Sequence, residues 1–340
     1  MRRIKWVGVM SLMTISLYAA SHDERQVSET VGTEIDYRDL VFSVDKKPMK
    51  IKIKDFGYAT RYLARYKDKE YFITELNPEY CLDEKIGQEV KEKLIQASQL
   101  NHPHVVSLEG YSLEIDLKEE ISPFYMTEKR EFTLEDYFKI EDKIYVSRRE
   151  LIFKTVSYSL RERLSILRQI VAGLQYLQSK NVRFIPTPYD IIFERQSPAT
   201  VKITNYWSFP LLKRAQPRED RRMGAIYMAP EIYKDENADP FVFGLAMLMW
   251  EILYQNKIDD LIHFPIEMQT QSFVEQGIRP SVEKKPMDWP VEKEESWKRL
   301  AFVICKAWAH NPADRATLEE IDKVIERVLV VDFETPKDAT

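Results

Sequence analysis

The sequence predicts an α+β fold in which antiparallel strands come first and helices follow. Alternating apolar residues between residues 51 and 76 indicate three strands joined by polar turns. Apolar residues at three- and four-residue steps across 164–177 are typical of an amphipathic helix. Short apolar runs at 191–193 and 201–204, separated by a polar turn, then predict a β-hairpin.

The composition fits a folded globular protein. The chain has 340 residues, of which 44% are hydrophobic and 31% charged, so it has enough apolar residues for a sizeable core. The net charge is −5 and no basic stripe is present, which argues against nucleic acid as a partner. Two cysteines, Cys81 and Cys305, are too few for a disulfide scaffold or a metal cage, so they are interpreted as buried or free thiols.

The first 21 residues resemble a secretory signal peptide. A basic start precedes an apolar run from Trp6 to Tyr18 and the small residues Ala19 to Ser21. The apolar run is short for a membrane span, so a cleaved signal is favoured over an uncleaved anchor. The predicted location is therefore outside the cell or in the secretory lumen, with no membrane attachment after cleavage. Residues 22–44 are predicted to be a polar lead-in, and an added first strand within 22–40 is the alternative.

The helix across 164–177 is predicted to end at Asn181. Gly173 lies inside it, where glycine costs about 1 kcal/mol relative to alanine. A closely packed neighbour is therefore expected at Gly173. A second helix is predicted from Lys85 to Leu100, and further strands at 105–108 and 124–127.

Several motifs in combination resemble the protein kinase superfamily. They are His102-Pro103-His104-Val105-Val106, Tyr227-Met228-Ala229-Pro230-Glu231, the run from Asp239 to Gly244, and Trp308 with Asn311-Pro312 and Arg315. The resemblance covers about residues 45–330, and the pattern near Trp308 is most similar to the tyrosine-kinase-like branch. It implies a two-lobed kinase-like fold, with a small five-stranded antiparallel lobe at 45–128 and a larger, mostly helical lobe at 131–330. The larger lobe would carry an insertion at about 139–158, and 331–340 would form a tail.

The positions that bind phosphate in that family are altered in this chain. In the family a glycine-rich loop approaches the phosphates, and a strand lysine, paired with a helix glutamate, binds them. Of the loop glycines, only Gly57 stands here. The lysine position holds Thr74, or Glu75 if the register moves by one residue, and the glutamate position holds Lys93.

The catalytic loop and the metal-binding positions are altered as well. Counted back from the hairpin, the catalytic aspartate position holds Ile185; counted forward from the helix, it holds Pro186. Neither side chain accepts a proton. The asparagine position holds Asp190 and the DFG aspartate position holds Asn205. We therefore expect no catalytic residues, no metal site and no cofactor, with ATP and Mg²⁺ binding weak or absent; Gly57, Asp190 and Asn205 are the weak candidates for such binding.

Two further expectations concern charged residues. Glu75 and Lys93 could form the strand-to-helix ion pair with its charges exchanged, and the alternative is two unrelated surface charges. The resemblance implies three structural anchors: Asp239 caps a buried helix, and Arg315 pairs with Glu231.

The sequence thus predicts a secreted pseudokinase, a kinase fold that acts as a protein-binding scaffold or allosteric regulator. The expected partner is a protein, either an active kinase or a phosphorylated or acidic protein. Candidate binding surfaces are the arginine-bearing segment before Tyr227, the insertion, and the helix around Lys93. One alternative is an atypical active kinase or nucleotide-binding transferase that uses Asp190 with a displaced acid. Another is a luminal chaperone-like or structural protein.

Overall fold

The structure is a computed structural model, and it describes residues 33–42, 59–76, 84–116, 118, 121–129, 132–134, 158–196, 199–207, 225–233, 241–256, 258 and 276–334. The predicted signal peptide, Gly57, residues 139–157 of the predicted insertion and the four arginines of the arginine-bearing segment lie outside these residues. Within them, no helix is both long enough and apolar enough to cross a membrane.

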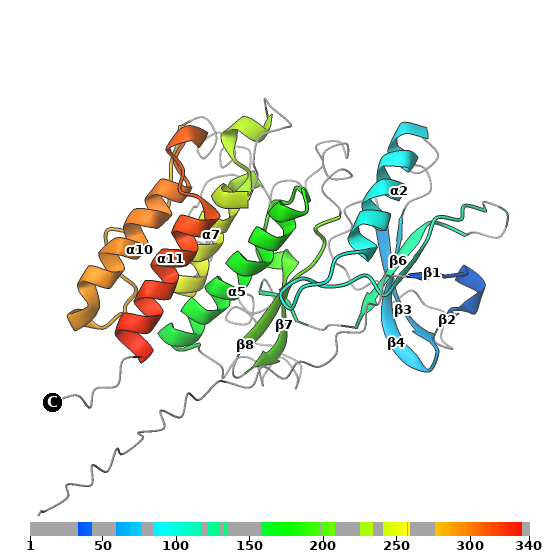
Figure 1. The fold of residues 1–340 in the computed structure, drawn as a ribbon, viewed down its shortest axis with the longest axis horizontal. Coiled ribbons are helices and arrows are strands. Elements are labelled where there is room, and N and C mark those ends of the chain that lie inside the picture. The colour runs from blue at the N-terminus through cyan, green and yellow to red at the C-terminus, as the bar shows by residue number, and fades with distance from the viewer. Residues whose placement is uncertain are drawn as a thin grey trace, which may run out of the picture. The chain divides into compact units, whose positions relative to one another are not determined.

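A six-stranded sheet forms the first part of the fold (Figure 1). Its strands are β1 (Thr33–Glu34), β2 (Val41–Phe42), β3 (Ala59–Tyr66), β4 (Lys69–Leu76), β5 (Gly110–Ser112) and β6 (Phe124–Glu128). The five strands β2, β3, β4, β6 and β5 pair antiparallel in that order, which confirms the predicted five-stranded antiparallel sheet. β1 adds a short parallel edge to β5, within the segment predicted as the lead-in.

The prediction of a strand at 105–108 was wrong, because the strand lies at Gly110–Ser112 instead. The backbone at Val105 and Val106 pairs with the other part of the fold. Val106 N donates to Ile203 O at 2.8 Å, and Val105 forms an isolated bridge to the same residue. This segment is apolar because it is buried where the sheet meets the hairpin strand β8 (Ala199–Ile203), not because it belongs to the sheet.

The two faces of the sheet are covered by different parts of the chain. On one face, Ile35 and Leu40 of the N-terminal segment pack against Tyr71, Ile73 and other buried residues of the sheet. On the other, Leu76 and Tyr125 belong to the same buried cluster as residues 90, 94 and 97 of α2 (Glu84–Ser98). Successive residues of a strand point to opposite faces, so Thr74 lies on the α2 face and Glu75 on the face covered by the N-terminal segment.

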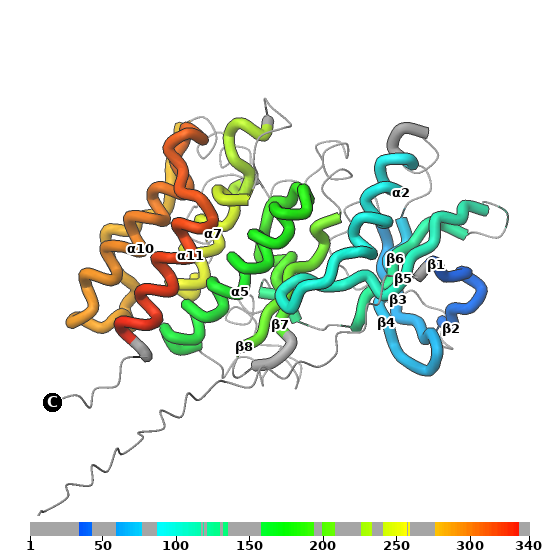
Figure 2. Tube along the Cα trace, viewed as in Figure 1, coloured from blue at the N-terminus to red at the C-terminus, as the bar shows by residue number. Residues whose placement is uncertain are grey.

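Helices and one hairpin make up the rest of the fold. The hairpin strands are β7 (Ile191–Gln196) and β8 (Ala199–Ile203), and the helices are α5 (Leu160–Ser179), α7 (Phe241–Tyr254), α10 (Glu294–Ala307) and α11 (Leu318–Leu329). The tube in Figure 2 shows α5, α7, α10 and α11 side by side, and these helices contact one another. The kinase-like α+β fold that the motifs implied is confirmed.

Helix α5 begins and ends as its sequence suggests. Ser159 and Glu162 form a reciprocal capping box at its start. Asn181 has φ = +54°, a left-handed conformation that asparagine tolerates and that ends the helix. Gly173 is buried in the helix, and a Cβ there would lie 2.7 Å from both His104 O and Ile203 Cδ1. The close neighbours expected at this glycine are thus the backbone at His104 and the side chain of Ile203 on β8.

Candidate functional site

A chain of hydrogen bonds crosses from the sheet to the segment that flanks the β7–β8 hairpin. It joins the side chains of Thr74 and Arg61 on the sheet to Asn205, Asp190 and Thr187, and we call these five residues the Arg61 network. It contains three of the positions that the sequence singled out: Thr74, Asp190 and Asn205.

Arg61 is the cation at the centre of this network. It lies directly opposite Thr74 in the antiparallel pair β3–β4, so both side chains project from the same face of the sheet. Arg61 Nε donates to Thr74 Oγ1 at 3.1 Å, and Arg61 Nη2 donates to Asn205 Oδ1 at 3.5 Å. The guanidinium also lies 5.5 Å from the centre of the Phe72 ring, within cation–π range. A fixed guanidinium therefore connects the lysine position with the DFG aspartate position.

Asp190 forms the other end of the network. It closes a short 3-10 turn, Pro188–Asp190, directly before β7. Its Oδ1 accepts from Asn205 Nδ2 at 3.0 Å, and its Oδ2 accepts from Thr187 Oγ1 at 2.6 Å and from Thr187 N at 3.1 Å. Asn205 has φ = +58°, which a short polar side chain tolerates. Both carboxylate oxygens of Asp190 are thus already engaged by neighbouring residues.

Burial raises the pKa of Asp190 to about 6, against the effect of its hydrogen bonds from Thr187 and Asn205. The folded protein therefore takes up this proton at a higher pH than the unfolded chain, whose carboxyl titrates near 3.8. The contribution of Asp190 to the free energy of unfolding should accordingly fall as pH rises from about 4 to about 6, and then stay level.

We predict that Asp190→Asn removes this pH dependence, because the amide does not titrate. Urea unfolding of the native chain and the variant at pH 4 and pH 7 measures the effect. The stability of the native chain relative to the variant should be lower at pH 7 than at pH 4. An equal difference at the two pH values would show that Asp190 does not titrate in this window.

The position of the catalytic aspartate is apolar. Counted back from the hairpin that position holds Ile185, and counted forward from the helix it holds Pro186. Ile185 is half-buried and packs against the main core cluster. Pro186, the other candidate, lies against α7, where its O would be 3.1 Å from a Cβ at Gly244. Neither residue provides a proton acceptor.

The proposed ion pair between Glu75 and Lys93 is absent, and this hypothesis was wrong. Glu75 Oε1 accepts from Tyr37 of the N-terminal segment at 2.8 Å, and Lys93 Nζ donates to Gln96 of its own helix at 3.2 Å. Burial raises the pKa of Glu75, as expected for a carboxylate covered by that segment. The reason is the strand alternation, which points Glu75 away from α2.

Aromatic residues fix the segment that follows Asn205. Tyr206 is buried, and its hydroxyl donates to Val106 O at 2.8 Å. The Trp207 ring meets the Tyr125 ring of β6 edge-on, with 4.8 Å between centroids. The start of this segment is therefore packed into the core beside the Arg61 network.

Two of the three implied structural anchors, Arg315 and Glu231, can be described, and they form an ion pair. The Arg315 side chain is 6% exposed and that of Glu231 is 16% exposed; both guanidinium nitrogens donate to the two carboxylate oxygens, with 2.7 Å between Nη2 and Oε2. Arg315 Nε also donates to Ala309 O at 2.9 Å. Asp239 lies outside the described residues, and so does Gly57.

The residues present do not fit a magnesium nucleotide. Mg²⁺ takes oxygen ligands, commonly carboxylates. The one carboxylate of the network, Asp190, already accepts three hydrogen bonds, and the oxygen of Asn205 accepts from a cation. A bound metal would have to displace Arg61 and break the contacts of Asp190.

Arg61 is the member of the candidate site that the sequence did not predict. The register that puts Arg61 opposite Thr74 is set by the turn between β3 and β4. In the structure this turn is a two-residue loop in which Lys67 and Asp68 both have positive φ. An arginine opposite the lysine position follows from that register.

Comparison with protein families gives one match. The model of a family described as protein tyrosine and serine/threonine kinase matches residues 79–325. Comparison with curated proteins gave no match.

Proposed function

The chain belongs to the protein tyrosine and serine/threonine kinase family, and we propose that it is a pseudokinase that binds a protein partner without transferring phosphate. The observation that carries the proposal is the Arg61 network. In place of a lysine and a metal-binding aspartate, the site holds Thr74 and Asn205, bridged by an arginine from the neighbouring strand.

The chemistry of phosphate transfer supports the same conclusion. The reaction depends on electrostatic positioning by a lysine, by metal ions and by a base that orients the hydroxyl. Ile185 offers no base, and the bonded atoms of Asp190 and Asn205 are a poor ligand pair for Mg²⁺. Losing such groups typically costs several orders of magnitude in rate.

The proposed setting is the secretory route, based on the N-terminal signal sequence. A kinase fold without transfer chemistry still offers the surfaces by which kinases contact other proteins. We therefore propose a scaffold or allosteric regulator whose partner is an active kinase or an acidic or phosphorylated protein.

The second candidate is an atypical active kinase, favoured by the carboxylate that remains at Asp190. Its pKa of about 6 lies near the pH at which a carboxylate exchanges protons in a working site. In this function Asp190 would act with a displaced acid, and Asp190→Ala would abolish phosphate transfer.

We predict that ATP with Mg²⁺ does not raise the melting temperature of the full chain. A ligand at about 100 times its Kd stabilises a fold by about 2.7 kcal/mol, a readily measured shift. Thermal unfolding should be recorded for the native chain, for Arg61→Ala and for Arg65→Ala, an exposed arginine on the same strand, which serves as the control. A magnesium-dependent shift in the native chain that disappears in Asp190→Ala would favour the active kinase.

A further inference from the structure

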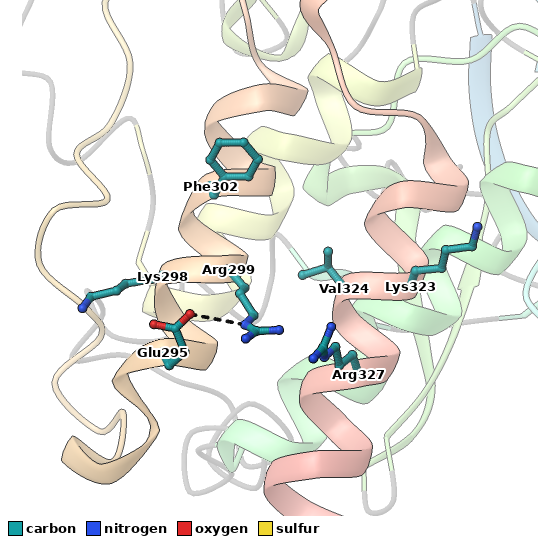
Figure 3. Close-up of a pocket in the computed structure, with 7 residues that line it drawn as sticks. All are labelled: Glu295, Lys298, Arg299, Phe302, Lys323, Val324 and Arg327. Atoms are coloured by element: carbon teal, nitrogen blue, oxygen red, sulfur yellow. Dashed lines mark ion pairs between the residues drawn. The ribbon is translucent and has the colours of Figure 1, made fainter.

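A surface groove lies between helices α10 and α11, on the helical part of the fold and outside the Arg61 network (Figure 3). It has a volume of about 420 Å³. Its apolar residues are Phe302 of α10 and Val324 of α11. Phe302 is 69% exposed and lies off the face that α10 buries, whereas Val324 is half-buried. The groove thus exposes the aromatic ring of Phe302 to solvent beside the aliphatic side chain of Val324.

Cations surround this apolar surface. Lys298 and Arg299 of α10 and Lys323 and Arg327 of α11 line the groove, with Glu295 as its one acid. Four cations and one carboxylate give the lining a charge of +3, although the whole chain carries −5. The lining of the groove is therefore positively charged although the whole chain is negatively charged, which favours a negatively charged partner.

The arginines are directed into the groove from opposite helices. Figure 3 shows the guanidinium groups of Arg299 and Arg327 facing the space between α10 and α11. Arg299 pairs with Glu295 at 3.6 Å, but that carboxylate is 72% exposed, so the pair is weakly held. Two like charges that converge on one space repel each other, and a carboxylate between them would relieve the repulsion.

The acids of α11 do not neutralise the groove. Glu326 and Asp322 lie toward α5, where Arg168 is 2.6 Å and 3.8 Å from their carboxylates. Glu320 lies 3.3 Å from Lys306. These acidic side chains pair with cations outside the groove, although Glu320 also lies within electrostatic range of Lys323, and Lys298 pairs with Glu294 of its own helix at 3.6 Å. The charge left to a ligand is therefore mainly that of Arg299 and Arg327.

We propose that this groove binds an acidic peptide segment of a protein partner that carries one apolar side chain. The apolar side chain would pack on Phe302 and Val324, and carboxylates would accept from Arg299 and Arg327, whose planar donors suit carboxylates. A peptide is favoured over an anionic membrane because the guanidinium groups of Arg299 and Arg327 face one narrow space between two helices. This inference rests on the proposed protein-binding function and identifies the surface that would bind the partner.

The test uses the full chain and a short fluorescein-labelled peptide in which glutamates flank a single leucine. Fluorescence anisotropy should detect binding that weakens with added salt. Arg299→Gln/Arg327→Gln should weaken it about tenfold or more, since bonds to charged groups are the strong ones. The matched control, Arg65→Gln/Lys118→Gln, removes two exposed cations elsewhere and should bind like the native chain. Phe302→Ser should reduce the affinity to that for a peptide with serine in place of leucine.

Three results would overturn the proposal. They are no binding of the glutamate–leucine peptide, equal binding of a peptide with lysines in place of the glutamates, and unchanged affinity in the arginine variant. Binding only to phosphatidylserine vesicles, lost in the arginine variant, would identify a membrane surface instead.

A parallel assay of phosphate transfer separates this inference from the proposed function. If the peptide does not bind and no phosphate is transferred, the groove proposal is wrong and the pseudokinase proposal is retained. Phosphate transfer would overturn the proposed function whatever the peptide result.

Discussion

Replacing Arg315 by methionine should lower the free energy of unfolding by about 3–5 kcal/mol, the range found when one partner of a buried ion pair is removed. The substitution leaves the carboxylate of Glu231 in a site where it is only 16% exposed. It also removes the bond to Ala309 O and the guanidinium over the Phe243 ring, 5.2 Å from its centroid. Urea unfolding measures the loss.

The matched control is Arg168→Met, which breaks ion pairs to Asp322 and Glu326 that are more exposed than the Arg315–Glu231 pair. Such pairs contribute about 0–1 kcal/mol, so the control should lose far less stability. The double variant Glu231→Met/Arg315→Met should recover part of the loss, because it leaves no buried charge alone. Equal losses in Arg315→Met and Arg168→Met would contradict the assignment of Arg315 as a buried anchor.

A side chain at Gly173 should destabilise the fold although alanine favours helices. In an open helix Gly→Ala gains about 1 kcal/mol. At Gly173 the new Cβ would lie 2.7 Å from His104 O, a backbone atom that cannot turn aside, and 2.7 Å from Ile203 Cδ1. Overpacking of this kind costs about 1–3 kcal/mol and occasionally more, so Gly173→Ala should lose stability and Gly173→Val should lose about 3 kcal/mol.

Gly87 provides the control, because it lies in helix α2 and is only half-buried. Gly87→Ala should leave stability unchanged or raise it by up to about 1 kcal/mol. The urea midpoint should therefore fall in Gly173→Ala and stay level or rise in Gly87→Ala. A stabilised Gly173→Ala variant would show that the contact between α5 and the segment at His104 is not tight.

Periodicity and turn chemistry predicted much of the fold. The hairpin β3–β4, the helices α2 and α5 and the hairpin β7–β8 follow from local patterns that their tertiary contacts reinforce. The strand at 105–108 was misplaced, because a run of buried residues looks the same whether it pairs within a sheet or links two parts of a fold.

Three residues of the candidate site could be predicted from the sequence, but the contacts between them could not. Thr74, Asp190 and Asn205 were identified from motif spacing, and the structure brings them together. Arg61 was missed although the register predicts it: Tyr66 lies opposite Lys69 at the turn, and five residues further out Arg61 lies opposite Thr74. Because side chains alternate along a strand, Glu75 points away from α2, and this arrangement excludes an ion pair between Glu75 and Lys93.

Contacts between distant segments could not be predicted. Tyr37 and Glu75 are 38 residues apart, and no spacing rule connects a short N-terminal segment to one face of a sheet. The groove between α10 and α11 is a further case. Its cations look like ordinary solvated charges in the sequence, and only the packing of the two helices directs Arg299 and Arg327 toward one space.

The central claim, that this kinase fold does not transfer phosphate, is tested most directly with γ-labelled ATP and Mg²⁺. The full chain should be assayed for label transfer to itself and to generic protein substrates, beside Asp190→Ala. We expect no incorporation above the level of the variant, because Ile185 supplies no base and Arg61 bridges Thr74 and Asn205. Incorporation by the native chain that disappears in Asp190→Ala would contradict this claim and establish an atypical active kinase.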